Sequence, residues 1–250
     1  MNSIVTAIAA ALILNLAACG DAAATDSRAG RSERVQFAKG AMSAVIKGRI
    51  KGDQYVDYQV RAGAGQTLSV EMKTSNASSY FNINPPGGGD AAMFIGSTAG
   101  SRFSGVVPSD GDYAIRVYLM RSAARRNESA SFTLTVGVAG QPLAATPTAK
   151  DALIPGTPFH ASAKVVCMPP FASSVRECEA FVIRRGFDGT ATVEVRWGER
   201  LQRRILFVQG KVVAADSPEA PSVVRRGDVS VVGFGRDERF EIPDALLSGG

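Results

Sequence analysis

Apolar residues recur at every second position in short stretches of this chain, and this alternation constrains the fold more than any other feature. Val56, Tyr58 and Val60, for example, alternate with polar residues. A period of two places apolar side chains on one face of a β-strand. Turn-forming residues such as Asp110-Gly111 separate the stretches, and short strands at this spacing predict an antiparallel sandwich or barrel. The stretches are residues 44–50, 55–60, 67–73, 103–107, 113–118 and 132–138.

The second half of the chain has the same pattern after a segment without periodicity. Residues 139–149 contain two prolines and are typical of a linker. Beyond them, Ala191 to Trp197 alternate so that Thr192, Glu194 and Arg196 are expected to face water. We predict an all-β chain with two small antiparallel sandwich or barrel domains, at residues 35–138 and 150–250. The strands expected in the second are residues 159–167, 180–185, 190–197, 203–209, 212–215, 229–234 and 240–242.

Residues 1–18 are typical of a bacterial lipoprotein signal peptide. Residues 4–14 are almost wholly apolar, and this run is shorter than the roughly 20 residues that cross a membrane. The sequence Leu16-Ala17-Ala18-Cys19 resembles a lipobox, which predicts lipidation, including palmitate, at Cys19. The alternative is a secreted protein cleaved near Ala18.

The residues after Cys19 bear on the localisation and on how the chain is tethered. Gly20 stands where an inner-membrane retention signal usually has Asp, so we expect an outer-membrane lipoprotein that faces the periplasm and contacts the membrane through its lipid. Residues 19–34 are small and polar and are expected to form a flexible tether.

The chain has three cysteines. If Cys19 carries a lipid, Cys167 and Cys178 remain as a pair, and a disulfide is the expected outcome in an oxidising periplasm. A metal site is the weaker alternative, because His160 is the only histidine. We therefore expect no metal and no cofactor.

Positive charge is concentrated in the first half. Residues 35–140 hold 11 Lys and Arg against 7 Asp and Glu, which is net +4, whereas residues 145–250 hold 14 against 13, which is net +1. No nucleic-acid-binding motif accompanies this moderate excess, so we expect no nucleic-acid partner. Attraction to an acidic protein or polymer is what the charge supports.

The chain lacks the residue patterns of an enzyme. No G-x-S-x-G sequence occurs, and His160 alone could serve a triad. The paired acids Asp110/Asp112 and Asp237/Glu238 lie in turn-like stretches, where turn formation and solubility explain them better than acid–base catalysis. We predict that the protein is not an enzyme.

One loop is longer than a hairpin needs. Residues 121–127, which we call the Arg loop, contain Arg121, Arg125, Arg126 and Asn127 between two predicted strands. Its arginines could simply keep a solvated loop soluble. Helix-forming Ala123 and Ala124 favour instead a short turn of fixed shape, and Arg suits forked pairing with a carboxylate.

Residues 35–138 resemble the periplasmic inhibitors of g-type lysozyme. The specific part of the resemblance is the pair of segments 111–117 (G-D-Y-A-I-R-V) and 121–127 (R-S-A-A-R-R-N), in this order and spacing. Weaker matches are residues 35–40, 48–52 and 62–66. Related inhibitors carry a Ser-Gly-x-Tyr motif, and here Asp110 stands where Ser is expected, with Ser109 just before it.

The resemblance implies a small β-sandwich that inserts loops into the substrate cleft of a g-type lysozyme. Arg121, Arg125, Arg126 and Asn127 are then expected to enter the cleft, with Tyr113 and Ser109 on its rim. The alternative is an accessory β module that binds carbohydrate or protein without inhibiting an enzyme.

The role of residues 150–250 and the oligomeric state stay open. Six arginines of this region could form a basic stripe or, as we expect, pair with its acids; they are Arg184, Arg185, Arg203, Arg204, Arg225 and Arg226.

Overall fold

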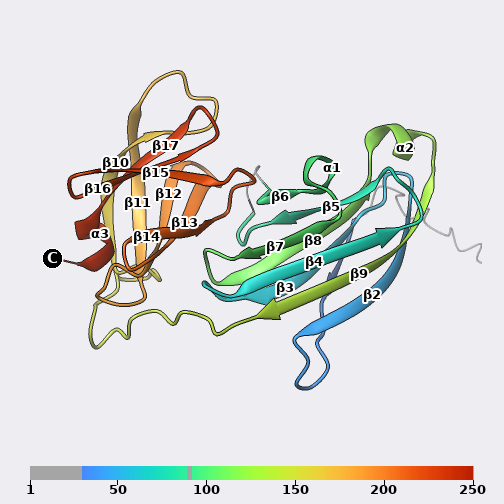
Figure 1. Ribbon diagram of the computed structural model, residues 1–250, viewed down its shortest axis with the longest axis horizontal. Helices are drawn as coiled ribbons and strands as arrows, with labels where there is room; N and C mark the ends of the chain where they lie inside the picture. Colours follow the sequence, from blue (N-terminus) through green and yellow to red (C-terminus); the bar gives the residue numbers. More distant parts are fainter. Residues whose placement is uncertain (1–29, 89–91, 250) are drawn as a thin grey trace, which may run out of the picture.

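The computed structural model describes residues 30–88 and 92–249, which are built mostly of β-strands (Figure 1). The predicted signal peptide, Cys19 and most of the tether lie outside the described residues. None of the described helices is long and apolar enough to cross a membrane. The all-β prediction is confirmed, because the helices are short: α1 (Gly96–Ala99), α2 (Arg121–Arg125) and α3 (Asp244–Ser248).

The first unit is a sandwich of two sheets, with strand orders β1-β3-β8-β5-β6 and β2-β9-β4-β7. Its strands pair antiparallel except β1, which pairs parallel with β3. The bounds are β1 (Arg31–Arg34), β2 (Ser43–Lys51), β3 (Val56–Ala62), β4 (Thr67–Thr74), β5 (Ser79–Asn84), β6 (Phe94–Ile95), β7 (Arg102–Val106), β8 (Gly111–Leu119) and β9 (Ser129–Ala139).

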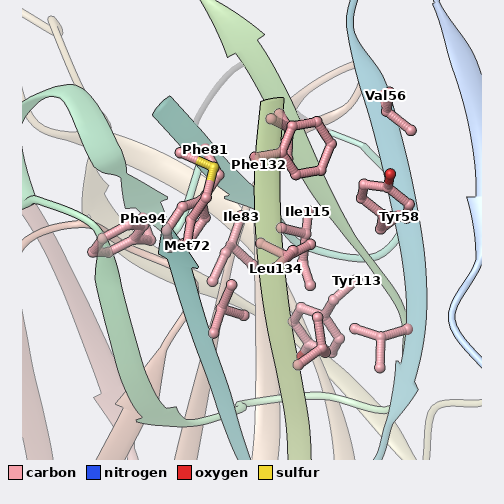
Figure 2. Close-up of a cluster of buried hydrophobic side chains, with 14 of the residues drawn as sticks. Val56, Tyr58, Met72, Phe81, Ile83, Phe94, Tyr113, Ile115, Phe132 and Leu134 are labelled. Atoms are coloured by element: carbon pink, nitrogen blue, oxygen red, sulfur yellow. The ribbon is translucent and has the colours of Figure 1, made fainter. Parts of the chain in front are cut away.

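The alternating apolar residues of the sandwich meet between its two sheets. Figure 2 shows Tyr58 and Ile115 of one sheet beside Leu134 and Phe132 of the other. The Tyr58 and Phe132 rings meet edge to face, with centroids 6.2 Å apart. Burying each such side chain contributes about 2 kcal/mol, so the sandwich has a core of its own.

The second unit is an eight-stranded antiparallel sheet that curls into a nearly closed barrel. Its order is β14-β13-β12-β11-β10-β17-β16-β15, and the two edge strands β14 and β15 approach each other. The bounds are β10 (Ala161–Met168), β11 (Arg176–Arg184), β12 (Ala191–Gly198), β13 (Leu201–Val208), β14 (Lys211–Ala215), β15 (Pro221–Arg226), β16 (Val229–Phe234) and β17 (Glu238–Pro243).

A disulfide joins β10 to β11. Cys167 and Cys178 are bonded, with Cα atoms 5.8 Å apart and 11 residues apart in sequence. Both cysteines belong to the barrel core. The predicted disulfide is present, and closing a loop of this length contributes about 3 kcal/mol in the chain-entropy model.

The barrel packs against one end of the sandwich. Ala64 of the sandwich is buried with Leu206 and Ala214 of the barrel, and Leu143 of the connecting segment packs against them. Thr192 donates a hydrogen bond of 2.8 Å to the Pro108 carbonyl. Figure 1 shows α2 at the end of the sandwich away from the barrel.

This contact corrects one sequence expectation. Thr192 and Glu194 were expected to face water, but both are buried. The outward face of β12 lies under the sandwich at Thr192, while Glu194 accepts from Arg196 and Arg204. Five consecutive residues of β12, Ala191 to Val195, are therefore buried.

All six arginines that could have formed a basic stripe are ion-paired. Arg184 pairs with Asp151, Arg185 with Asp110 of the sandwich, and Arg203 with Glu238 and Asp216; the remaining pairs are Arg204 with Glu194 and Asp216, Arg225 with Asp244, and Arg226 with Glu241. Their charge is balanced by acids, as the sequence led us to expect, and they form no free basic stripe.

Asp216 gives the barrel a testable pH dependence. Its carboxyl is buried, and burial raises its pKa to about 6, although Arg203, Arg204 and the Arg204 N–H hydrogen bond oppose the rise. Between these two pKa values the Asp216 carboxyl is protonated in the folded state, whereas in the unfolded state it loses its proton near pH 3.8. Unfolded chains bind fewer protons in this window, so this group lowers stability as pH rises from about 4 to 6.

Because other carboxyls also titrate, the effect of Asp216 must be isolated by substitution. We expect the free energy of unfolding of Asp216→Asn, relative to that of the parent chain, to rise by about 1–3 kcal/mol between pH 4 and pH 7. Urea unfolding at several pH values measures this difference. A difference that is flat with pH would show that Asp216 has the same pKa in both states.

Candidate partner-binding surface

The Arg loop has a fixed conformation built on buried alanines. α2 occupies its centre, where Ala123 and Ala124 belong to the sandwich core. The Ala124 N–H donates to the Met120 carbonyl over 2.9 Å, and the Glu128 N–H donates to the Ala123 carbonyl over 3.2 Å. The two alanines therefore fix the short turn against the core, which agrees with the helix-forming tendency seen in the sequence.

Neighbouring loops hold both ends of α2. The Met120 N–H donates to the Ser78 carbonyl over 2.8 Å, and the Gly52 N–H donates to the Glu128 carbonyl over 2.9 Å. Asn127 ends the turn with φ of 55°, a left-handed conformation that Asn tolerates better than most residues. A side chain at Gly52 would meet the Asn127 Oδ1 at 2.9 Å, so glycine permits this close approach.

The three arginines of the loop have different environments. Arg126 pairs with Glu128, 2.7 Å away, and Glu128 also accepts a 2.9 Å hydrogen bond from Asn76. These contacts lower the pKa of Glu128, and the Asn76 hydrogen bond makes the largest contribution. Arg121 and Arg125 are exposed and have no ion-pair partner among the described residues. They are four residues apart on α2, so they lie on the same helical face.

A hollow adjoins α2 on the β3–β8 side. Arg121 and Met120 line it together with residues of β5, β8 and the turn before β3, namely Asp53, Tyr55, Asn82, Arg116 and Tyr118. Arg116 makes two 2.7 Å hydrogen bonds to Asp57, which raise its pKa, and its guanidinium lies 4.3 Å from the centroid of the Tyr55 ring. Beside Arg121, the hollow is therefore lined by Arg116, which Asp57 fixes in place, and by the rings of Tyr55 and Tyr118.

Sequence reasoning missed this hollow. Its residues are scattered over the chain from position 53 to position 124 and come together only through the pairing of β8 with β3 and with β5. The one available signal was the opposite charge of Asp57 and Arg116, which face each other across the pair of β3 and β8.

Tyr113 and Ser109 do not lie beside the Arg loop. Tyr113 is near the start of β8 and Ser109 just before that strand, whereas α2 follows its end; Tyr113 and Ser109 are 0% and 5% exposed. The Tyr113 hydroxyl donates to the Ser109 carbonyl over 2.8 Å and lies 3.3 Å from the Ser109 Oγ. Tyr113 and Ser109 are therefore not on an exposed rim but make a buried structural contact, because Tyr113 lies on the apolar face of β8, which packs in the core.

Asp110, which replaces the expected Ser, faces the barrel. Its carboxylate accepts a 2.9 Å hydrogen bond from the Ala64 N–H and forms a 2.8 Å ion pair with Arg185. The Arg185 side chain is fully buried. Arg185 also donates to the Leu143 carbonyl and to Thr192. The acid at this position therefore joins the sandwich to the barrel.

The described residues offer little material for metal binding. Within residues 30–88 and 92–249, no group of three His, Cys, Asp or Glu side chains could hold a metal ion. His160 is buried, with its Nε2 3.1 Å from the Thr146 carbonyl and its Nδ1 accepting from the Arg184 N–H. Both ring nitrogens are thus used in structural hydrogen bonds.

Part of the chain is similar in sequence to a known protein. An inhibitor of g-type lysozyme from Escherichia coli K12 is 29% identical over 116 residues, which are 46% of this chain and 86% of the relative. Solved inhibitors of g-type lysozyme from Aeromonas hydrophila and Salmonella Typhimurium are 33% and 26% identical. Each covers 44% of this chain, with 97% and 100% of the inhibitor covered, and the TM-scores are 0.40 and 0.35. No protein-family model matches the chain.

The identity to the Escherichia coli inhibitor confirms the resemblance to the g-type lysozyme inhibitors. The matched share, 46% of the chain, agrees in size with the sandwich, and it covers 86% of that relative. The comparisons account for no more than that share of the chain.

Proposed function

We propose that this chain is an envelope lipoprotein whose sandwich, related to the inhibitors of g-type lysozyme, inhibits such a lysozyme through the Arg loop. The observation that carries the proposal is that Arg121 and Arg125 project from a turn held by buried Ala123 and Ala124. A loop that is ordered before binding loses less conformational entropy on association.

The proposed mechanism acts on the catalytic acid of the lysozyme. A glycosidase of this kind needs a protonated carboxylic acid to donate to the glycosidic oxygen. A guanidinium within about 4–6 Å favours the ionised carboxylate and lowers its pKa, which removes the acid. Arg121 and Arg125 supply this charge, Arg126 and Asn127 flank them, and the bulk of the loop excludes the glycan.

The hollow beside α2 extends the contact surface in this proposal. Tyr55 and Tyr118 offer amphipathic rings, which suit the centre of protein–protein interfaces. Tyr113 and Ser109 are left out, because both are buried. The proposed location is the periplasmic face of the outer membrane, with Cys19 lipidated.

Protection of sensitive bacterial cells from lysis tests this function. The chain beginning at Asp21, which keeps every described residue, is mixed with goose-type or chicken-type lysozyme, and the loss of turbidity is followed. We expect protection from the goose-type enzyme alone. Equal lysis with and without the chain would refute inhibition of that enzyme.

The barrel supports a second candidate function. The relatives are covered almost completely by less than half of this chain, so inhibition gives the barrel no role. A non-enzymatic carbohydrate- or protein-binding module is the alternative that fits an additional β unit with its own core. Binding of the chain to isolated envelope glycan with no inhibition of lysozyme would favour this alternative.

A further inference from the structure

Among the strands of the sandwich, the unpaired positive charge lies on one of the two outer sheet faces. On the sheet β1-β3-β8-β5-β6, Arg34 and Arg61 approach Asp112, and Arg116 pairs with Asp57. On the sheet β2-β9-β4-β7, by contrast, four basic residues have no acid within 4.0 Å among the described residues, and Arg102 is paired with Glu71. These four, which we call the basic face, are Lys47, Arg49, Lys51 and Lys73, all exposed.

The strand register places the four cations close together on the same side of the sheet. Lys47 and Lys73 both pair with Thr133, one from each side. Arg49 and Lys51 follow Lys47 at every second position of β2, and Ser131 and Ser129 lie opposite them. Neighbouring strands are about 4.8 Å apart and residues two apart on a strand about 6.8 Å, so the cations occupy an area about 14 Å by 10 Å.

Four like charges at this spacing repel one another, and the acid on the same side of β4, Glu71, is paired with Arg102. Such an arrangement attracts a partner that carries many negative charges. The other outward positions of these strands carry mostly hydroxyls and no aromatic residue. The face therefore lacks the aromatic rings typical of ligand pockets and protein interfaces.

Exposed apolar side chains at the start of β2 indicate which polyanion fits. Met42 is 67% exposed and Val45 is 64% exposed, and Val45 projects from the same side of β2 as Lys47 and Arg49. Cations beside exposed apolar residues are typical of surfaces that rest on lipid headgroups. A soluble anionic polymer would bind the cations but would leave the apolar residues in water.

We propose that the basic face binds the surface of a bilayer containing anionic phospholipid, with Met42 and Val45 at the boundary of the acyl chains. The basic face lies on the strands and not on α2, and it adjoins the Arg loop only at Lys51, which precedes Gly52. The proposed contact does not depend on lysozyme inhibition. A lipid at Cys19 and a basic face together supply the two signals that stable membrane binding requires.

Sedimentation with vesicles tests this proposal. The chain beginning at Asp21, which carries no lipid, is mixed with vesicles of phosphatidylglycerol and phosphatidylcholine in equal parts, or of phosphatidylcholine alone. We expect binding to the mixed vesicles only, and loss of binding in salt that shortens the screening length to about 3 Å. Replacing Lys47, Arg49, Lys51 and Lys73 by Gln should lower the partition coefficient about tenfold or more, because each cation contributes separately.

A matched variant separates position from net charge. Lys150→Gln, Lys164→Gln, Lys211→Gln and Arg236→Gln remove the same charge outside the sandwich, from the connecting segment and the barrel, and should leave binding within about twofold of the parent. Unchanged binding of the basic-face variant would overturn the proposal. So would sedimentation with peptidoglycan sacculi but not with vesicles, which would indicate a carboxylate polymer instead.

The same variants distinguish this proposal from inhibition. The basic-face variant keeps Arg121 and Arg125, so it should still protect cells from the goose-type enzyme. Retained inhibition with lost vesicle binding supports two separate surfaces, and vesicle binding by a chain that does not inhibit refutes only the proposed inhibition.

Discussion

Replacing Arg121 and Arg125 together by Ala is expected to weaken inhibition of a g-type lysozyme about 100-fold or more. Both side chains are exposed and unpaired among the described residues, so they are available to a partner carboxylate. Removing one member of a buried, hydrogen-bonded charge pair costs about 2–5 kcal/mol, and each 1.4 kcal/mol is tenfold in affinity. The inhibition constant of the purified double variant, measured against the parent chain, gives the answer.

Two controls show whether position rather than charge matters. Lys39→Ala with Lys150→Ala removes two exposed cations away from α2 and should change the inhibition constant less than about threefold. Arg126→Ala should have a smaller effect than the double variant, because Glu128 already holds Arg126. If the Arg121 and Arg125 double variant inhibits like the parent, the Arg-loop mechanism is wrong even if the protein is an inhibitor.

Alternation predicted most strands whose two faces differ in environment, but not β5, whose burial also alternates. β3 and β8 each bury one face and expose or half-expose the other, and both were expected from the sequence. β1 and β15 are exposed at every residue, so burial does not alternate along either strand. Residues 31–34 were expected to belong to a flexible tether, but they pair with β3, because that edge offers unpaired backbone groups.

The sequence identified the Arg loop but not its surroundings. Ala123 and Ala124 predicted a short fixed turn because helix propensity acts locally. The hollow beside Arg121 could not be predicted, since it depends on which strands become neighbours. The expected rim position of Tyr113 failed for a related reason: β8 crosses the whole sandwich, so Tyr113 and Arg121 lie at opposite ends.

Asp110, which stands where the related inhibitors are expected to have Ser, lies at the junction between sandwich and barrel. Ser109 supplies the oxygens that the Tyr113 hydroxyl contacts. Asp110 is then available to pair with Arg185 of the barrel. Asp110 therefore joins the sandwich to the barrel, and the junction leaves the opposite end of the sandwich, with α2, open to a partner.

Replacing Arg203 by Ala is expected to lower the free energy of unfolding of the barrel by about 3–5 kcal/mol, because it leaves a buried carboxylate without its counter-ion. Arg203 is 2% exposed and donates hydrogen bonds of 2.6 and 2.9 Å to Glu238, and another to the Asp216 carbonyl. Its pKa is raised by Glu238 and Asp216 even though burial opposes this. Urea unfolding, followed by the fluorescence of the single tryptophan, Trp197, reports directly on the barrel.

A second substitution separates the pair from the general packing of the barrel. Arg203→Met with Glu238→Leu removes both charges and keeps most of the volume, so much of the lost stability should return. A double variant as unstable as Arg203→Ala would show that the contacts of Arg203 with the Asp216 carbonyl and carboxylate matter more than its pair with Glu238. Because Arg203 lies in the barrel and the Arg loop lies at the far end of the sandwich, inhibition by the folded fraction should be unchanged. Loss of inhibition along with barrel stability would instead mean that the sandwich needs the barrel to hold α2 in place.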